Sequence, residues 1–105
     1  MVFERIGFKV EDFDKFKGVF TGRGSVRKSF SSKGSKVYVD PGNNKSVVIV
    51  FEWADADKMK EFSESDDLKE AMKSAGVAGP PEFKVADNEA ELDVSGLTLS
   101  FSTET

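Results

Sequence analysis

The sequence predicts an α+β domain in which amphipathic helices pack on one antiparallel sheet, and three segments carry this prediction. In residues 2–10 mostly apolar side chains occupy every second position, and residues 47–53 form a short apolar run. Residues 65–77 are apolar at helical spacing, with a glycine at position 76 that can end a helix. Along the chain the predicted order is strand, helix, two strands, helix and strand, with one more strand at the end. This βαββαβ order is that of the ferredoxin-like fold.

The first predicted strand covers residues 2–10. Val2, Ile6, Phe8 and Val10 share one of its faces, and Glu4 is the single exception on that face. An alternation of period two over nine residues is typical of a strand with one face in the core.

A helix is predicted next, because Asp12 can act as its N-cap and three phenylalanines, at 13, 16 and 20, follow at spacings of three and four. Glycines at 22 and 24 interrupt it. We expect Ser25 to cap a second helical stretch and Gly34 to end that stretch.

The central part of the chain reads as a hairpin, with strands at residues 36–40 and 46–53 joined by a turn at 40–44. The second strand is apolar on both faces. Such a strand needs something packed on each side. Helices can cover one face, and we expect a second sheet, from a second subunit, to cover the other.

Two short helices are predicted after this hairpin, with Asp55 and Ser65 as N-caps and Gly76 as the terminating residue. Residues 79–81, Gly-Pro-Pro, are expected to form a rigid turn, and a strand is expected from residue 83. The acidic stretch 87–93 is expected to be solvated. The apolar faces of the helices and of a final strand are formed by Met59, Phe62, Leu68, Ala71, Met72, Ala75, Leu97, Leu99 and Phe101.

Composition excludes several classes of protein. The chain has 105 residues, a net charge of −4, and neither cysteine nor histidine, so disulfides, thiolate or imidazole metal sites and a cysteine nucleophile are excluded. No basic cluster favours nucleic acid, and the longest apolar run is too short to span a bilayer. We expect one domain, residues 1–105, in the cytoplasm, without metal or cofactor and without a membrane or nucleic-acid partner.

A resemblance to a known family rests on Phe51-Glu52-Trp53, Asp55, Phe62, Leu68 to Met72, Ala75-Gly76-Val77 and Gly79 to Glu82, with weaker matches at Asp12, Phe16, Phe20, Arg27, Gly34 and Asp40. With these residues the chain resembles the dimeric α/β-barrel superfamily, near the antibiotic-biosynthesis monooxygenase-like and cyclase-like small proteins. The resemblance implies two ferredoxin-like subunits packed sheet to sheet as a homodimer. It also implies a small pocket within each subunit, and a terminal strand and tail at residues 93–105 that can pack on the partner.

Three charged residues are candidate catalytic groups. Arg23 and Arg27 lie four residues apart and can stabilise a developing negative charge, because guanidinium stays charged and donates in a fork. Relatives of the cyclase-like type often carry a histidine where this chain has Arg23. Glu52 can act as a general base if it is buried. The alternatives are that both arginines are solvated and that Glu52 reaches solvent or pairs with a neighbouring cation.

Four apolar residues are candidates for the lining of a ligand pocket: Trp53, Phe16, Phe20 and Met72. The alternative is an ordinary core, with Trp53 as a core or dimer-interface anchor. A pocket requires that the core be incompletely filled.

Two functions therefore compete. The first is a cofactor-independent monooxygenase- or cyclase-like enzyme that binds a small hydrophobic or aromatic ligand within the subunit. The second is a non-catalytic ligand-binding or structural homodimer. The sequence leaves open whether the protein is an enzyme, because fold resemblance alone does not establish a reaction.

Overall fold

The computed structural model describes residues 1–104. The strands are β1 (Val2–Val10), β2 (Ser32–Asp40), β3 (Asn43–Trp53), β4 (Val77–Ala86) and β5 (Thr98–Thr103). The helices are α1 (Phe13–Gly22), α2 (Gly24–Ser29), α3 (Ala56–Ser63) and α4 (Asp66–Ser74), with a 3₁₀ turn, η1 (Glu89–Glu91).

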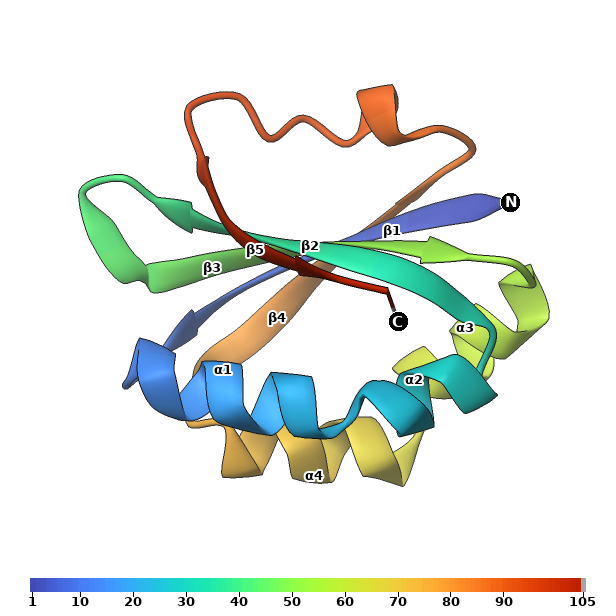
Figure 1. The fold of residues 1–105 in the computed structure, drawn as a ribbon, viewed down its shortest axis with the longest axis horizontal. Coiled ribbons are helices and arrows are strands. Elements are labelled where there is room, and N and C mark those ends of the chain that lie inside the picture. Colours follow the sequence, from blue (N-terminus) through green and yellow to red (C-terminus); the bar gives the residue numbers. More distant parts are fainter. Residues whose placement is uncertain (105) are drawn as a thin grey trace.

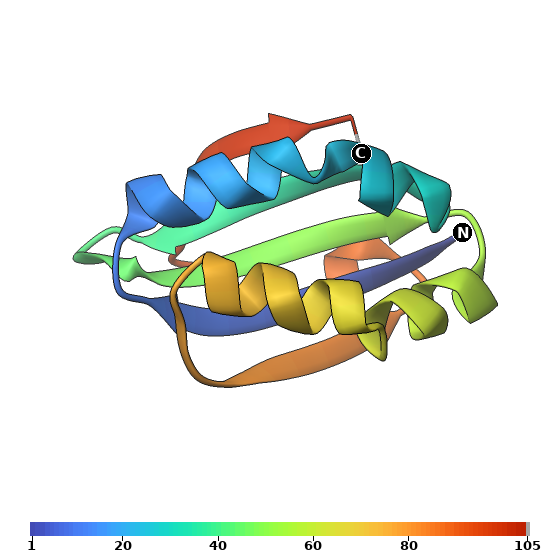
Figure 2. The same cartoon turned by 90° about the horizontal axis from the view of Figure 1, so that it is seen from below.

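The strands of residues 1–104 form one antiparallel sheet with the order β4-β1-β3-β2-β5. All the α-helices lie on one face of it, as Figure 1 and the view from below in Figure 2 show. The predicted α+β, ferredoxin-like architecture is therefore confirmed. The fifth strand, β5, extends the sheet beyond β2, so β2 is an internal strand and not an edge.

The main core lies between this sheet and the helices, where alternate residues of β1 and β3 meet the apolar faces of α1, α3 and α4. Glu4 and Arg27 are charged side chains buried on this side of the sheet. The buried apolar residues of this core are Ile6, Phe8, Val10, Phe16, Phe20, Val37, Val47, Ile49, Phe51, Trp53, Met59, Phe62 and Ala75.

Three predicted helix caps are present. The Asp12 carboxylate accepts from the backbone N–H groups of Asp14 and Lys15 at 2.9 and 3.2 Å. Asp55 does the same for α3, and the Ser65 hydroxyl accepts from the Leu68 N–H at 3.1 Å. Each cap satisfies a donor that the first turn of a helix leaves free.

The predicted limits of the second helix are wrong. α2 begins at Gly24 directly after Arg23, which makes no side-chain cap, so Ser25 is not the N-cap. The helix ends at Ser29, and Ser31 turns the chain with a left-handed φ of 77°. Gly34 lies inside β2 and does not end the helix.

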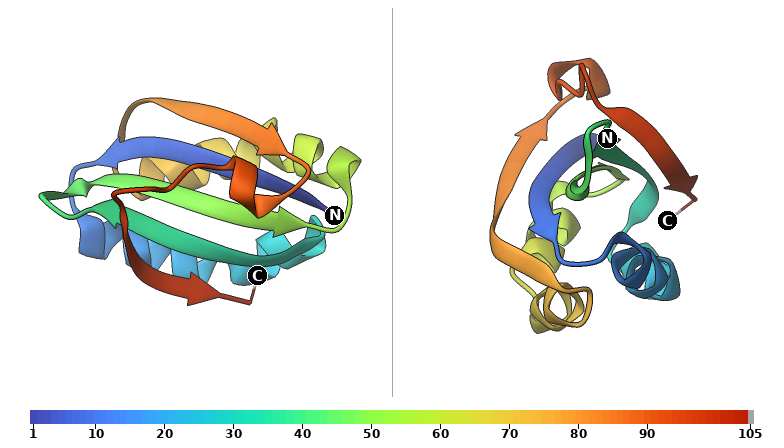
Figure 3. Two further views of the ribbon diagram at one scale, coloured as in Figure 1. Left: turned by 90° about the horizontal axis from the view of Figure 1, so that it is seen from above. Right: turned by 90° about the vertical axis from the view of Figure 1, so that its left-hand side faces the viewer.

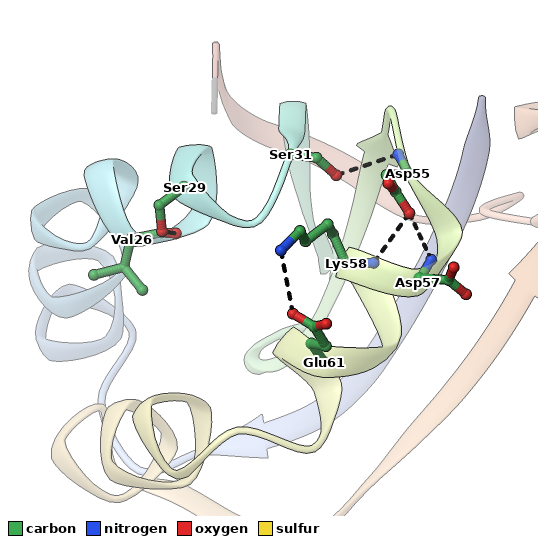
Figure 4. Close-up of polar contacts among 7 residues, drawn as sticks. All are labelled: Val26, Ser29, Ser31, Asp55, Asp57, Lys58 and Glu61. Atoms are coloured by element: carbon green, nitrogen blue, oxygen red, sulfur yellow. Dashed lines mark hydrogen bonds and ion pairs between the residues drawn. The ribbon is translucent and has the colours of Figure 1, made fainter.

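Ser31 also joins two connections that are far apart in sequence (Figure 4). Its hydroxyl accepts from the Asp55 N–H at 3.2 Å, and its carbonyl accepts from the Ala54 N–H at 3.0 Å. The start of β2 is thereby held against the start of α3. The Asp55 cap and a Lys58–Glu61 ion pair of 3.5 Å continue this polar network along α3.

The Gly-Pro-Pro segment was expected to form a turn between elements, and this expectation is wrong. The segment is part of β4. Lys9 pairs with Ala78 and Gly7 pairs with Glu82, so residues 79–81 form a bulge in the register. An edge strand tolerates proline because its outward N–H has no ladder partner. Gly79 has a φ of 76°, which a glycine adopts without steric cost.

The sheet face opposite the helices is less apolar than expected. On β1 this face carries Phe3, Arg5, Gly7 and Lys9, because Ile6 and Phe8 point into the core. Residues 87–97 cross the same face, as Figure 3 shows. Leu92, only 2% exposed, packs there in a second cluster with Val50. The chain thus covers part of its own outer face, and the expectation that residues 87–93 are wholly solvated is wrong for Leu92.

The terminal strand pairs with β2 of the same chain. Phe101 packs against the rings of Phe13 and Phe20 at centroid distances of 6.4 and 5.9 Å. The hydroxyls of Ser35 and Thr103 lie 2.6 Å apart. Within residues 1–104 no helix is long and apolar enough to cross a membrane.

Candidate functional site

The helices α1–α2 and α4 lie side by side on one face of the sheet (Figure 2). A cavity of about 60 Å³ lies between these helices and the sheet. Three elements of the sheet and four helices contribute to it. The lining consists of Ile6, Phe8, Phe16, Val19, Phe20, Arg23, Val26, Arg27, Ile49, Phe51, Phe62, Asp67, Leu68, Ala71, Met72, Ala75 and Val77.

The seating of α4 explains why this space is unfilled. Its apolar residues have ideal helical spacing, yet none of the residues of α4 is fully buried. Leu68, Ala71 and Met72 are half-buried and border the cavity, and Leu68 also packs against the main core. Arg23 and Asp67 also border the cavity, and Asp67 is exposed. The charged side chains of Arg23 and Asp67 thus lie at the border of the cavity.

Arg27 is the buried cation of this site, with only 3% of its surface exposed. Its Nη1 donates to the Phe20 carbonyl oxygen at 2.6 Å, and its guanidinium lies 3.8 Å from the centre of the Phe20 ring. Burial lowers the pKa of Arg27 to about 10. Because this value is still well above neutral pH, the side chain stays charged there. The cavity wall thus holds a fixed positive charge against an aromatic face.

The predicted site residues are only partly brought together. Arg23, Arg27, Phe16, Phe20 and Met72 all border the cavity. Their roles toward a ligand stay predictions.

Trp53 lies outside the lining. It is fully buried, and its ring packs 5.1 Å from the ring of Phe62 and 5.3 Å from that of Phe51. Trp53 therefore stands behind two residues of the cavity wall as a core anchor, which was the alternative interpretation.

Glu52 is directed away from the cavity. Phe51 and Trp53, its neighbours in β3, point into the core, so Glu52 projects from the opposite face of the sheet. The pKa of Lys36 is raised mainly by its hydrogen bond to Glu89, and the negative charge of Glu52 adds to this effect. It is only partly buried. The expectation that Glu52 supplies a base to the pocket is corrected by this strand geometry.

Glu4 is the buried carboxyl that the prediction of site residues missed. It is 1% exposed, and its Oε2 accepts a hydrogen bond of 2.7 Å from the Ser63 hydroxyl. Its Oε1 and the indole Nε1 of Trp53 are both buried without a correctly oriented hydrogen-bond partner. Burial raises the pKa of Glu4, and the Ser63 hydroxyl and the Trp53 indole only partly oppose that effect. The sequence contained a signal for this residue, because Glu4 is the one charged side chain among the apolar residues on the inward face of β1.

Chemically, the site offers an apolar chamber with a fixed cation in its wall and a second cation and a carboxylate at its border. Such a chamber can bind a small apolar ligand that carries a negative charge or develops one. Among residues 1–104 no group of three or more carboxylates is placed to hold a metal ion.

Solved structures with this fold were found by comparison. An assigned antibiotic biosynthesis monooxygenase from Bordetella bronchiseptica is 17% identical, with a TM-score of 0.69 over 83% of this chain and 95% of that one. A similarly assigned protein from Caulobacter crescentus is 17% identical, with a TM-score of 0.65 over 83% and 88%. A variant of SnoaB, a cofactor-independent oxygenase from Streptomyces nogalater, is 14% identical, with a TM-score of 0.67 over 84% and 92%.

The sequence matches no family model, and no curated protein is significantly similar to it. The structural likeness nevertheless covers more than four fifths of the chain in each case. At these identities it establishes the fold and not a reaction. This chain has the ferredoxin-like α+β fold of the antibiotic biosynthesis monooxygenase-like proteins.

Proposed function

We propose that the protein is a cofactor-independent monooxygenase-like enzyme that binds a small aromatic or enolisable ligand in the cavity between the sheet and the helices. The observation that carries the proposal is Arg27, a buried cation in the wall of an otherwise apolar chamber. The oxygenase SnoaB, which has this fold, supports the reaction class.

In the proposed reaction the substrate supplies the electrons. Loss of a proton from an acidic CH₂ group leaves a carbanion, which adds O₂ at carbon. The peroxide anion formed in this way takes back the proton that the base removed, and the resulting hydroperoxide then loses water and leaves a carbonyl group. The CH₂ carbon is thus oxidised, one oxygen atom enters the product, and the other leaves as water. Arg27 stabilises the negative charge of the carbanion, because a fixed cation in a dry site needs no reorganisation.

Glu52 cannot supply the base for this reaction, since it lies on the other face of the sheet. Asp67 is the carboxylate that borders the cavity, and Arg23 borders it too. We assign proton removal to Asp67 and charge stabilisation to Arg27, with Arg23 as the cation that attracts the anionic ligand at the entrance.

Size limits the ligand that the observed state can hold. A cavity of about 150 Å³ takes up benzene, whereas this one measures about 60 Å³. A ring can therefore enter only if α4 moves outward. Because no residue of α4 is fully buried, that movement breaks few close contacts.

Oxygen uptake with anthrone tests the proposal, because anthrone has an acidic CH₂ group flanked by aromatic rings. We expect the protein to accelerate O₂ consumption and formation of the quinone, and Arg27→Lys to slow it by about tenfold or more. Lys69→Gln, on the exposed surface of α4, is the matched control. Catalysis would be refuted if the wild-type protein oxidised neither anthrone nor hydroxylated naphthalenes faster than heat-denatured protein does.

The second candidate is a non-catalytic ligand-binding or structural homodimer, and the small volume of the cavity favours it. Anthrone binding without oxygen uptake would support this alternative. In both cases we propose a homodimer through the sheet face opposite the helices. Leu99, 51% exposed, is an apolar residue available there. Light scattering at micromolar concentration tests the dimer, and a monomer would exclude it. A cytoplasmic location stays a prediction.

A further inference from the structure

The inner cavity has two kinds of wall. On the sheet side, Ile6 and Phe51 line it and are only 1% and 2% exposed, so this wall is fixed by the core. On the α4 side, Ala71 and Met72 line it and are half-buried, and no residue of α4 is fully buried. The space against the sheet is therefore permanent, whereas the space against α4 can change in size.

The volume of the cavity matches a guest of very few atoms. A single buried water needs about 10–15 Å³ of cavity volume, and an apolar cavity of about 150 Å³ takes up benzene or xenon. The inner cavity measures about 60 Å³. In the observed state it can therefore take up a diatomic molecule or a noble-gas atom, and an aromatic ring is too large for it.

The lining favours an apolar guest over water. Within residues 1–104, the side chains that line the cavity are apolar except for those of Arg23, Arg27 and Asp67. A buried water needs several polar partners, and an apolar cavity without them stays dry. The sheet wall at Ile6 and Phe51 presents no polar side-chain atom, so a small apolar molecule is the guest that fits it.

A fixed positive charge stands beside this dry space. The guanidinium of Arg27 is held by a hydrogen bond of 2.6 Å to the Phe20 carbonyl oxygen and lies 3.8 Å from the centre of the Phe20 ring. That ring lies 6.1 Å from the ring of Phe51 in the sheet wall. When a carbanion adds O₂, its electron pair forms the C–O bond and the outer oxygen takes the negative charge. A fixed cation stabilises this charge more than it stabilises neutral O₂.

We propose that the sheet side of the inner cavity is a dioxygen site, separate from the space that the organic ligand occupies. O₂ takes the volume that already exists against Ile6 and Phe51, and the ring of the ligand takes the space that outward movement of α4 adds. This assignment rests on the proposed function, because an oxygenase needs both reactants beside Arg27. A dry site also keeps water away from the carbanion, which water would protonate.

Methyl NMR under pressurised gas tests the site without catalysis. O₂ is paramagnetic and raises the relaxation rates of the methyl groups that it reaches. We expect strong effects at the buried methyl groups of Ile6 and Ile49, which line the cavity. Val37 is the internal control, because it is 0% exposed and lies outside the lining, so its methyl groups should show little effect. Xenon, a diamagnetic apolar guest, should shift the Ile6 and Ile49 signals saturably.

Two variants change the volume of the cavity in opposite directions. Ala71→Leu fills it from the α4 side and should remove the effects of O₂ and xenon on Ile6 and Ile49. Ala56→Leu adds the same group at the exposed start of α3 and should leave these effects unchanged. Ile49→Val removes one carbon from the sheet wall and should strengthen the binding of xenon, followed at Ile6.

The gas experiments and the oxygenase assay fail independently. Relaxation effects at Ile6 and Ile49 no larger than those at Val37, or effects that persist in Ala71→Leu, overturn the dioxygen site even if anthrone is oxidised. If O₂ and xenon enter the cavity as expected and anthrone is not oxidised, the gas site stands and the proposed reaction is wrong.

Discussion

The guanidinium of Arg27 lies 3.8 Å from the centre of the Phe20 ring and donates a 2.6 Å hydrogen bond to the carbonyl oxygen of the same residue. Phe20 belongs to the last turn of α1, and its carbonyl oxygen also accepts from the backbone N–H of Arg23 at 3.3 Å. A single side chain of α2 thus adds a second hydrogen bond at the end of α1, covers an aromatic ring and forms part of the cavity wall. Stability and ligand binding depend on the same residue.

Replacement of Arg27 by alanine should lower the free energy of unfolding by about 2–3 kcal/mol, because it removes a buried hydrogen bond and leaves a cavity. Arg27→Lys should cost about 1 kcal/mol, since it keeps the charge and loses the planar contact with Phe20. Urea denaturation measures both. Arg23→Ala is the control, expected within about 0.5 kcal/mol of the wild type because Arg23 is only half-buried. Equal losses at the two arginines would contradict this account.

Glu4 should make the folded state less stable as the pH rises. Because burial raises its pKa above the ordinary value of 4.5, folding favours the protonated carboxyl. The wild type is thus relatively most stable below pH 4.5 and loses stability above it, until Glu4 ionises in the folded state.

The variant Glu4→Gln keeps the shape and the acceptor for Ser63 and cannot ionise. At pH 7 we expect it to exceed the wild type in stability by about 1 kcal/mol, and the difference should vanish at low pH. Denaturation at several pH values measures this, with the exposed Glu70→Gln as control. A variant less stable than the wild type at pH 7 would mean that the ionised carboxylate stabilises the fold.

The order of elements could be predicted because local signals agree with it. Asp12, Asp55 and Ser65 cap helices in the structure as their sequence positions indicated. The bulge at residues 79–81 could not be foreseen, because Gly-Pro-Pro is also a typical turn sequence and only pairing with β1 decides between the two. Long-range register is a tertiary property that local composition does not encode.

The candidate site was predictable in its helical part and not in its strand part. Arg27, Phe16, Phe20 and Met72 share the inner surface because helical spacing places them there. Glu4 and Glu52 illustrate the limit for strands. Each lies next to apolar residues, but a shift of one residue exchanges the two faces of a strand. Glu4 follows the inward set of β1, whereas Glu52 follows the outward set of β3.

Two glycines should respond in opposite directions to alanine. Gly18 lies in the interior of α1 with nothing within 4 Å of an added Cβ, so Gly18→Ala should stabilise the protein by about 0.5–1 kcal/mol. Gly76 ends α4 with a φ of 74°, so Gly76→Ala should destabilise it by about 1–2 kcal/mol. Thermal unfolding of the two variants side by side measures the contrast. The same sign for both would show that the left-handed conformation at Gly76 is not required.

Filling the inner cavity should separate ligand binding from stability. Ala71 borders the cavity on the half-buried face of α4. In Ala71→Leu an isobutyl group should occupy the space that a ligand needs, and burial of that group should raise stability by about 1 kcal/mol.

Anthrone binding, followed by fluorescence of Trp53 behind the cavity wall, should weaken at least tenfold in Ala71→Leu. Ala56→Leu adds the same group at the exposed start of α3 and should change neither property. If Ala71→Leu is more stable and still binds anthrone as tightly as the wild type, the ligand does not enter between α1–α2 and α4. Anthrone would then have to bind elsewhere, and neither Arg27 nor Asp67 could act on it directly.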